Sequence, residues 1–389
     1  MDNGITIMAV GGAGCRIIHE FVKFDFAGNF KLLAVDSDLE SLDRTSLPDD
    51  SKIQAGRLWR SGLGCGGDEM SGQLALANER KRLNDVLSGT RILLIVAGLG
   101  GGLATGGLAV ILGVAAKLHI TTLLLGTLPF AMEGFQRRKL ADDKIKGDFL
   151  PLADAVITLP NDLLFMRLSP DTPLQEAFKQ SDQEMARSLA SLAAVLGGGN
   201  LFSADFAAIT GLLKRRHTLC SMGCAVIDTG SDAPEKLMEN LLVSPLLGGA
   251  EAFENADGVV FSLLGGTELS LGNAKNVLEL ATRQLDPSFN KPVLLGAGVS
   301  EALQGKLQLT ALTVKYLDRK NDLPEEKASK PFVRKKIADQ KNGTQMELPN
   351  LITEDKGIME NTVSVIINGE DMDIPAYKRK GIVLEIKNK

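Results

Sequence analysis

The sequence lacks several features that would assign the protein to a specialised class. It has only four cysteines in 389 residues, and Cys220 and Cys224 form a CxxxC pair without further ligands nearby, so we expect reduced thiols and no metal site. A signal-peptide pattern is missing, because the N-terminus runs directly into the apolar segment 5–10. The 43 basic and 48 acidic residues give a net charge of −5, which argues against a nucleic-acid-binding surface.

One uncharged stretch, residues 92–116, is long enough to resemble a membrane span, which needs about 20 apolar residues. Six of the ten residues from Gly98 to Gly107 are glycines, however, and each glycine disfavours a helix by about 1 kcal/mol. We therefore predict a buried strand at 92–97, a glycine loop at 98–107 and an apolar helix at 108–118. No transmembrane insertion is expected.

Short apolar runs alternate with helical patterns over the first 160 residues. This succession predicts an α/β fold with a parallel sheet covered by helices on both faces, because strands buried on both faces are continuously apolar. Ligands of such sheets bind where loops leave the carboxyl ends of the strands. The expected strands are 5–10, 30–35, 92–97, 121–127 and 155–159, with a helix at 15–24 after the first.

The second half begins with a long helical pattern at 174–196, which three glycines at 197–199 bring to an end. Beyond it we expect a second, smaller α/β domain. Its expected strands are 223–228, 258–264, 292–297 and 307–316, with helices at 235–242 and 273–285. We therefore divide the folded part into a Rossmann-like domain at 1–173, a central helix at 174–199 and a second domain at 200–317.

Composition changes after Tyr316, since 14 basic and 13 acidic residues fall among the last 72. We interpret residues 318–364 as a flexible charged linker and 365–389 as a C-terminal binding peptide. The segment around Asn368 and Gly369 could form a small hairpin, or the basic tail could contact an anionic membrane. The sequence leaves these two readings open.

Glycine-rich loops follow two of the expected strands, at 11–15 and 98–107, and a third lies at 62–67. Such a loop before a helix can bind phosphate through backbone N–H groups, or it can be only a tight turn. The first loop is not a dinucleotide fingerprint, because Ile17 replaces the third glycine, and no P-loop lysine is present. We therefore predict that these loops hold phosphates through backbone dipoles and a cation.

Motifs in sequence order resemble those of the tubulin/FtsZ superfamily, and specifically those of bacterial FtsZ, over nearly the whole chain. Residues 11–16 resemble the family's GGAGxN loop, and 100–106 resemble its GGGTGTG signature. The segments that resemble FEGxxR, IPND, two second-domain motifs and the terminal docking peptide are 132–137, 159–162, 244–250, 265–271 and 373–380. The sequence therefore resembles that of a divergent FtsZ.

The resemblance implies a GTP/GDP site, with Mg²⁺ accompanying the nucleotide. Asp182 would hydrogen-bond the guanine edge, although a solvated helix charge is the alternative; Glu133 and Arg137 could equally be an i,i+4 surface pair. The residues that the resemblance assigns to GTP are Gly11, Gly12, Ala13, Gly14, Cys15, Arg16, Gly101, Gly102, Leu103, Ala104, Thr105, Gly106, Glu133, Arg137, Asn161 and Asp182.

The sequence departs from the family where hydrolysis is completed by the next subunit. The family's loop after the central helix reads Asn-x-Asp-x-x-Asp; here Asp205 remains, whereas Ser203 and Ala208 replace the other two residues. Loss of a group that orients water commonly lowers a rate by about 10²–10⁴. Leu103 and Ala104 also alter the signature loop, and Leu103 must point away from the nucleotide. We therefore expect GTP binding with slow hydrolysis.

The resemblance further implies head-to-tail filaments that form a division ring in the cytoplasm, on the inner face of the cell membrane. A membrane adaptor of the FtsA or ZipA kind would bind the terminal peptide through Asp373, Ile374, Pro375, Ala376, Tyr377 and Arg379. Two other functions are considered. A filament scaffold could hold nucleotide without useful turnover, and a nicotinamide-dependent oxidoreductase is favoured only by the glycine loops.

Overall fold

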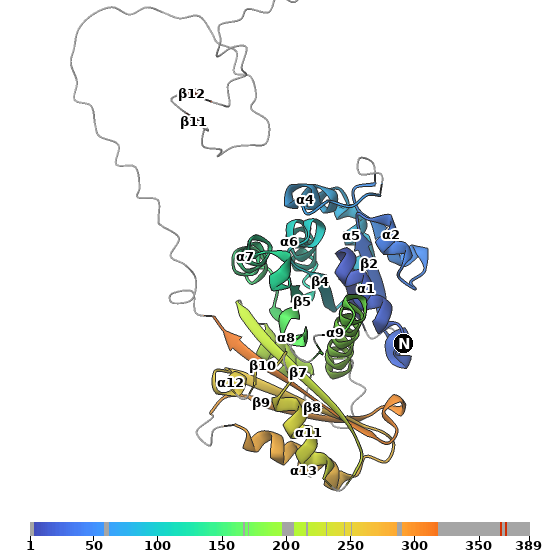
Figure 1. The fold of residues 1–389 in the computed structure, drawn as a ribbon, viewed down its shortest axis with the longest axis vertical. Helices are drawn as coiled ribbons and strands as arrows, with labels where there is room; N and C mark the ends of the chain where they lie inside the picture. The colour runs from blue at the N-terminus through green and yellow to red at the C-terminus, as the bar shows by residue number, and fades with distance from the viewer. Residues whose placement is uncertain are drawn as a thin grey trace, which may run out of the picture. The chain divides into compact units, whose positions relative to one another are not determined.

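The computed structural model describes residues 4–57, 62–165, 168–169, 171–196, 206–214, 217–230, 232–244, 246–249, 251–285, 290–317, 366–367 and 370–371. The chain divides into two units, Met1–Glu326 and Lys327–Lys389, and each is described by itself. Figure 1 shows the first unit as a sheet flanked by helices.

The described strands of the first unit form one sheet in the order β3-β2-β1-β4-β5-β6-β7-β10-β8-β9. Neighbouring strands from β3 to β7 run parallel, β10 is antiparallel to both β7 and β8, and β8 is parallel to β9. The strands are β1 Ile5–Val10, β2 Lys31–Asp36, β3 Lys52–Gln54, β4 Ile92–Gly98, β5 Thr121–Leu128, β6 Ala155–Pro160, β7 Thr218–Asp228, β8 Gly258–Gly265, β9 Val293–Val299 and β10 Lys306–Tyr316.

The central strands β1, β4 and β5 are mostly apolar and are buried at nearly every position, because both faces of the sheet are covered. In β1, Ile5, Ile7 and Ala9 enter the core cluster beneath α1 Gly11–Phe21 and α9 Leu174–Leu196. Met8 and Val10 enter the cluster on the other face. The expected strands of both halves are confirmed to within two residues, except that β7 begins at Thr218 and not at residue 223. The three-residue β3 was too short to be predicted.

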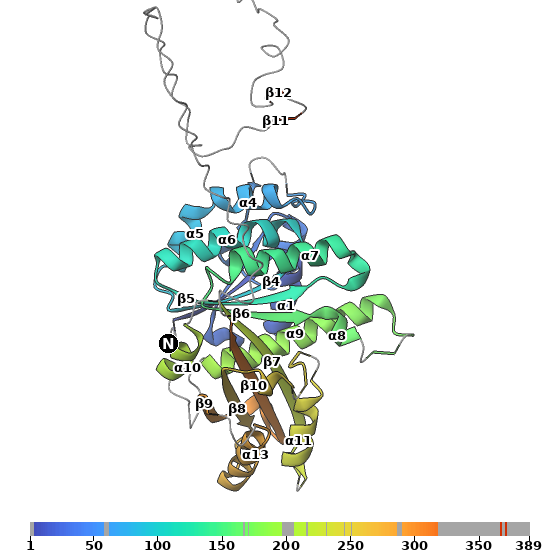
Figure 2. The ribbon, with the colours of Figure 1, turned by 90° about the vertical axis from the view of Figure 1, so that its left-hand side faces the viewer.

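Helices cover the sheet on two sides, as Figure 2 shows for α4, α5, α6 and α7 on one side and α9 on the other. The long helix α9 was predicted with its observed bounds. Its buried residues join the core of the first strands to β7 and β10. The other helices are α2 Leu39–Asp43, α4 Glu69–Asn78, α5 Arg80–Leu87, α6 Gly102–Lys117, α7 Phe135–Lys144, α8 Asn161–Phe165, α10 Phe206–Leu213, α11 Ala233–Leu242, α12 Glu251–Glu254 and α13 Leu271–Arg283.

Two predictions of helix starts were wrong. Helix α6 begins at Gly102, not at residue 108, and α1 begins at Gly11, not at residue 15. Intrinsic propensity was overridden by tertiary packing. A Cβ on Gly106 would overlap the carbonyl group of Glu69, and one on Gly72 would overlap that of Gly102, so glycine lets α4 and α6 approach at backbone distance.

In the second unit, Ile366–Ile367 pairs antiparallel with Glu370–Asp371, which fits the hairpin reading of that segment. The terminal peptide 373–380 lies outside the described residues. None of the described helices combines the length and the hydropathy needed to cross a bilayer.

Candidate functional site

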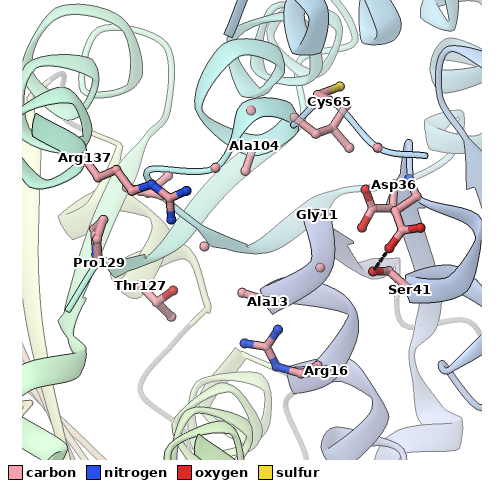
Figure 3. Close-up of a pocket in the computed structure, with 18 of the residues that line it drawn as sticks. Gly11, Ala13, Arg16, Asp36, Ser41, Cys65, Ala104, Thr127, Pro129 and Arg137 are labelled. Carbon is pink, nitrogen blue, oxygen red and sulfur yellow. Dashed lines mark hydrogen bonds between the residues drawn. The ribbon is translucent and has the colours of Figure 1, made fainter. Parts of the chain in front are cut away.

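A cavity of about 500 Å³ opens at the edge of the sheet where β1, β2, β4, β5 and β6 end (Figure 3). Each of these parallel strands contributes residues at or just beyond its carboxyl end. The lining residues are Gly11, Gly12, Ala13, Arg16, Asp36, Ser37, Asp38, Ser41, Gly64, Cys65, Gly98, Leu99, Gly101, Gly102, Leu103, Ala104, Thr127, Leu128, Pro129, Phe130, Glu133, Arg137, Asn161 and Phe178. Eleven of the sixteen residues assigned to GTP from the sequence are among them.

The N-termini of α1 and α6 both open into this cavity. Neither helix has a side-chain hydrogen bond at its N-cap, and neither has an acidic residue in its first turn. The first backbone N–H groups of a helix have no intrahelical partner, and the helix dipole makes that end positive. Two such ends at one cavity form a binding site for an anion such as phosphate.

Three of the residues expected to bind the nucleotide do not line the first cavity; they lie within α1 and α6 and make contacts that hold these helices in place. A Cβ on Gly14 would lie 2.6 Å from the carbonyl oxygen of Val96, so glycine allows α1 to pack on β4. The buried Thr105 hydroxyl accepts a hydrogen bond of 2.7 Å from the N–H of Gly100. Gly106 lies against α4.

Leu103 lines the cavity and also belongs to the buried apolar cluster that contains Leu76 and Leu108. Its exposed fraction is only 4%. Most of this side chain is therefore enclosed between α6 and its neighbours.

A second cavity of about 500 Å³ adjoins the first and shares Gly12, Arg16, Ser41 and Phe178 with it. Cys15 and Asp182 line this second cavity. Burial raises the pKa of the Cys15 thiol, which keeps it protonated. The phenyl ring of Phe178 meets that of Phe130 edge to face, with 5.2 Å between the ring centroids.

Asp182 is not a solvated helix charge. Its carboxylate oxygen Oδ2 accepts a hydrogen bond of 2.8 Å from Nε of Arg16, and its side chain is only 14% exposed. Burial raises the pKa of Asp182, and the Arg16 guanidinium acts in the opposite direction. The pair places a donor group and a carboxylate next to each other on the wall of the second cavity.

The segment after β5 forms part of the wall of the first cavity. Glu133 pairs with Arg137 at 3.1 Å and also accepts the N–H of Phe130 at 3.0 Å. Asp162, directly after Asn161, accepts from the N–H of Ala131 at 2.9 Å and from Arg138 at 3.1 Å. Two carboxylates thus hold the Pro129–Glu133 segment in place, and the role of Asp162 was missed from the sequence.

The sequence reasoning also missed an acidic corner at the end of β2. Asp36 Oδ1 accepts the N–H groups of Ser37 at 2.7 Å and Asp38 at 3.2 Å. Asp38 Oδ2 accepts from the Ser41 hydroxyl at 2.6 Å, and this bond is the dashed line that ends on Ser41 in Figure 3. Burial raises the pKa of Asp36 to about 6. The signal was available, because a strand was expected at 30–35 in the parallel sheet, and the Asp-Ser-Asp sequence that follows it lies at the carboxyl-end edge where ligands bind.

Two buried acceptor atoms of this cavity have no hydrogen-bond partner among the described residues: Asp36 Oδ2 and Asn161 Oδ1. A buried polar atom without a partner carries an energetic cost, so these atoms fit groups that a ligand supplies. An amide oxygen suits an O–H or N–H donor. A carboxylate oxygen beside a phosphate-binding helix end suits a hard cation such as Mg²⁺.

The predicted hydrolytic loop lies mostly outside the described residues, including Ser203 and Asp205. Ala208 is described and half-buried in the first turn of α10. Figure 2 places α8 near one end of α9 and α10 near the other.

Residues 4–168 match the family model described as the GTPase domain of the tubulin/FtsZ family. The chain is 30% identical over 330 residues to cell division protein FtsZ 1 of Pyrococcus furiosus, with 83% of this chain and 84% of that relative covered. The fold is similar to the FtsZ dimer of M. jannaschii, with a TM-score of 0.71, 28% identity, and coverage of 80% of this chain and 87% of that one. CetZ2 of Haloferax volcanii, solved as a GTPγS-bound protofilament, shares the fold at a TM-score of 0.65 and 20% identity, with 82% and 94% covered.

Proposed function

The chain belongs to the tubulin/FtsZ family, and from that premise we propose that it binds GTP in the described cavity and assembles head to tail into filaments. The observation that carries the proposal is the convergence of two N-termini without side-chain caps, those of α1 and α6, on one cavity. Backbone N–H groups and helix dipoles bind the phosphates there without a P-loop lysine.

In this proposal the first cavity holds the phosphates and the sugar of the nucleotide, and the second cavity holds the base. The phosphates lie over Gly11–Ala13 and Gly101–Ala104. The base extends into the second cavity, which the aromatic ring of Phe178 and the carboxylate of Asp182 line. Asn161 Oδ1 and the Glu133–Arg137 pair lie beside the first cavity and contact the sugar and phosphate region.

The length of α9 supports a site that two subunits share. Asp182 lines the second cavity. Leu196 lies 14 residues further along α9, and at about 1.5 Å per residue this separates the two residues by roughly 20 Å. We therefore propose that the loop to which Asp205 and Ala208 belong serves the cavity of another copy. A contact between different faces of two copies propagates as a filament unless it closes into a ring.

Exposed apolar side chains next to the cavity fit the same arrangement. Leu63, Met132 and Phe135 are each at least two-thirds exposed and are neighbours in sequence of the lining residues Gly64 and Glu133. Apolar side chains around a polar cavity mark a surface that a partner covers. In this proposal the partner is the next subunit.

Hydrolysis is proposed to be slow. Asp205 is the remaining carboxylate of the loop and orients the attacking water of the adjacent subunit. Ala208 can neither accept a proton nor hold a cation, so one of the two family carboxylates is missing. GTP or GDP is the resident nucleotide.

Mg²⁺ is proposed to accompany the phosphates. A bound Mg²⁺ neutralises charge that develops on the phosphate oxygens. Asp36 is the described side chain with a free oxygen suited to it.

The cellular setting follows from the family resemblance. Filaments would form the division ring in the cytoplasm, on the inner face of the membrane. The peptide with Asp373, Ile374, Pro375, Ala376, Tyr377 and Arg379 would bind an adaptor of the FtsA or ZipA kind. Many weak tethers along one filament then act together by avidity.

A second candidate is a filament scaffold that keeps its nucleotide, and Ala208 is the residue that favours it. Sedimentation with GTP, with GDP and with a slowly hydrolysed GTP analogue tests both candidates. Pelleting with GTP followed by disassembly as GTP is consumed supports the proposed GTPase. Pelleting that persists equally with all three nucleotides supports the scaffold, and failure to bind guanine nucleotide rejects the proposal.

A further inference from the structure

The segment 62–68, which leads into α4, forms one wall of the first cavity. Gly64 and Cys65 line that cavity, and Cys65 is 5% exposed (Figure 3). The backbone nitrogen of Asp68 and the Cβ of Cys65 both lie 2.9 Å from the position that a Cβ would occupy on Gly102. Gly102 lines the cavity as the first residue of α6, so the segment lies against a helix end that binds phosphate in the proposed function.

Helix α4 is held on the protein by few buried side chains. Its buried residues are Gly72, Ala75 and Leu76, of which only Leu76 has a large apolar side chain. Met70 and Leu74 are more than half exposed. An element with few buried apolar contacts opens locally at a lower free energy than the whole protein unfolds. The contacts of α4 with its neighbours therefore decide how firmly this wall of the cavity stays closed.

A lysine connects the first residue of α4 to the end of α7. Nζ of Lys144 lies 3.2 Å from Oε2 of Glu69 and donates a hydrogen bond of 2.9 Å to Oδ2 of Asp148. The Lys144 side chain is 28% exposed, and that of Glu69 is 35% exposed. Figure 2 shows α4 and α7 on the same side of the sheet as α6. Lys144 thus joins two helices that both begin at the cavity.

Local structure fixes the position of Lys144. The chain continues from α7 into a π-helical turn, η4 Ile145–Phe149, whose first and last residues are buried in the same core cluster as Leu76. The hydrogen bond to Asp148 raises the pKa of Lys144, partial burial lowers it, and the hydrogen bond to Glu69 raises it further. The lysine therefore stays charged and anchored beside the core, and Glu69 is the group through which it holds α4.

We propose that Lys144 is a positioning residue for nucleotide retention: through Glu69 it holds α4, and with it the segment 62–68, closed over the first cavity. The inference rests on the proposed binding of GTP or GDP in that cavity. Opening of the segment releases the nucleotide, so the rate of release depends on how often the contact between Lys144 and Glu69 breaks. An ion pair between partly exposed groups contributes modestly, so breaking it should change the release rate by about three- to fivefold.

The test measures the release of a fluorescent GDP from the full chain, by stopped-flow displacement with excess unlabelled GDP. Lys144→Gln and Glu69→Gln should each speed release by about three- to fivefold. The double variant should release GDP no faster than either single variant, since both changes break the same contact. Lys144→Arg keeps the charge and should restore the wild-type rate.

Asp148→Asn is the matched control, because it removes an acid that pairs with the same lysine but lies outside α4. It should release GDP at close to the wild-type rate. An equal increase in Asp148→Asn and Glu69→Gln would mean that any change of charge near Lys144 speeds release, and unchanged release in Lys144→Gln would mean that the lysine does not act on the cavity. Either result overturns the proposal.

The buried thiol of Cys65 gives a second measurement, made without nucleotide. Opening of the segment exposes this thiol, so Lys144→Gln should speed its alkylation by N-ethylmaleimide, read for each cysteine by peptide mass spectrometry. Cys220, which is 1% exposed in β7, should react at the wild-type rate. Equal acceleration at Cys65 and Cys220 would mean that the variant only destabilises the fold, and it overturns the proposal. If the wild type binds no guanine nucleotide, the proposed function fails and this inference with it; nucleotide that leaves all variants at one rate rejects the inference alone.

Discussion

The guanidinium of Arg16 donates from Nε to Oδ2 of Asp182 across 2.8 Å, which joins the first helix of the chain to the central helix α9. Residues 166 positions apart in sequence thereby form one wall of the cavity. The pair offers a donor and an acceptor side by side. Guanine presents the complementary set, with an acceptor at O6 and donors at N1 and N2.

Asp182→Ala should weaken GTP binding by about 10- to 100-fold, because a hydrogen bond to a charged group contributes about 1.5–3 kcal/mol. The preference for GTP over ATP should fall as well, since in the proposed binding mode the lost acceptor faces the base. Competition of GTP and ATP against a fluorescent nucleotide measures both effects. Glu184→Ala, which removes an acid that pairs with Arg187 on the same helix, is the control and should leave the preference unchanged.

Ala208→Asp should raise GTP turnover by at least about tenfold in assembled protein, because it restores a carboxylate that can orient water. Turnover should rise steeply with protein concentration if the site is shared between subunits. Gly211→Asp places a carboxylate nearly one turn further along α10, in open space, and should have little effect. Equal stimulation by both variants would show that added charge alone is responsible.

Gly106→Ala should lower the free energy of unfolding by about 1–3 kcal/mol, since the new methyl group overlaps the Glu69 carbonyl and forces α4 away from α6. Gly113→Ala in the same helix has open space at the Cβ position and should raise it by about 0.5–1 kcal/mol. Denaturant unfolding of the two variants measures the difference. Changes of the same sign would contradict the close-packing role of Gly106.

Asp162→Asn should release the wall of the cavity, because it weakens the contacts with Arg138 and the N–H of Ala131. Since exposed ion pairs are worth only about 0–1 kcal/mol, we expect a loss of a few-fold in nucleotide affinity together with faster nucleotide release. Stopped-flow displacement gives the release rate. Asp143→Asn, on the exposed side of α7, serves as the comparison and should release nucleotide at the wild-type rate.

Burial raises the pKa of Asp154, whose carboxylate accepts the N–H of Thr122 at 2.8 Å. The folded state therefore holds a proton to higher pH than the unfolded state does. Its contribution to stability is present below the unfolded pKa of about 3.9 and is lost as pH rises through the folded pKa. In that window the free energy of unfolding of wild type should fall relative to Asp154→Asn. A parallel pH dependence of the two proteins would count against this effect.

Much of the cavity around the N-termini of α1 and α6 could be predicted from the sequence, because it depends on residues close together in the chain. Apolar runs such as Ile5–Val10 form buried strands, and Gly11–Ala13 leave backbone N–H groups accessible. The start of α6 could not be predicted, because glycine propensity opposes it and the contact with α4 decides it. The motif resemblance indicated Asp182, but its pairing with Arg16 depends on how α1 and α9 pack together.

The sequence by itself determined the order of strands and helices, the glycine turns and the family motifs, because these depend on residues close together in the chain. Tertiary structure alone decided that Asp36 and Asn161, 125 residues apart, present unpaired buried oxygens to one cavity. The physical reason is that parallel strands bring distant loops to a common edge, where burial and the neighbouring N–H groups determine which oxygen stays available for a ligand.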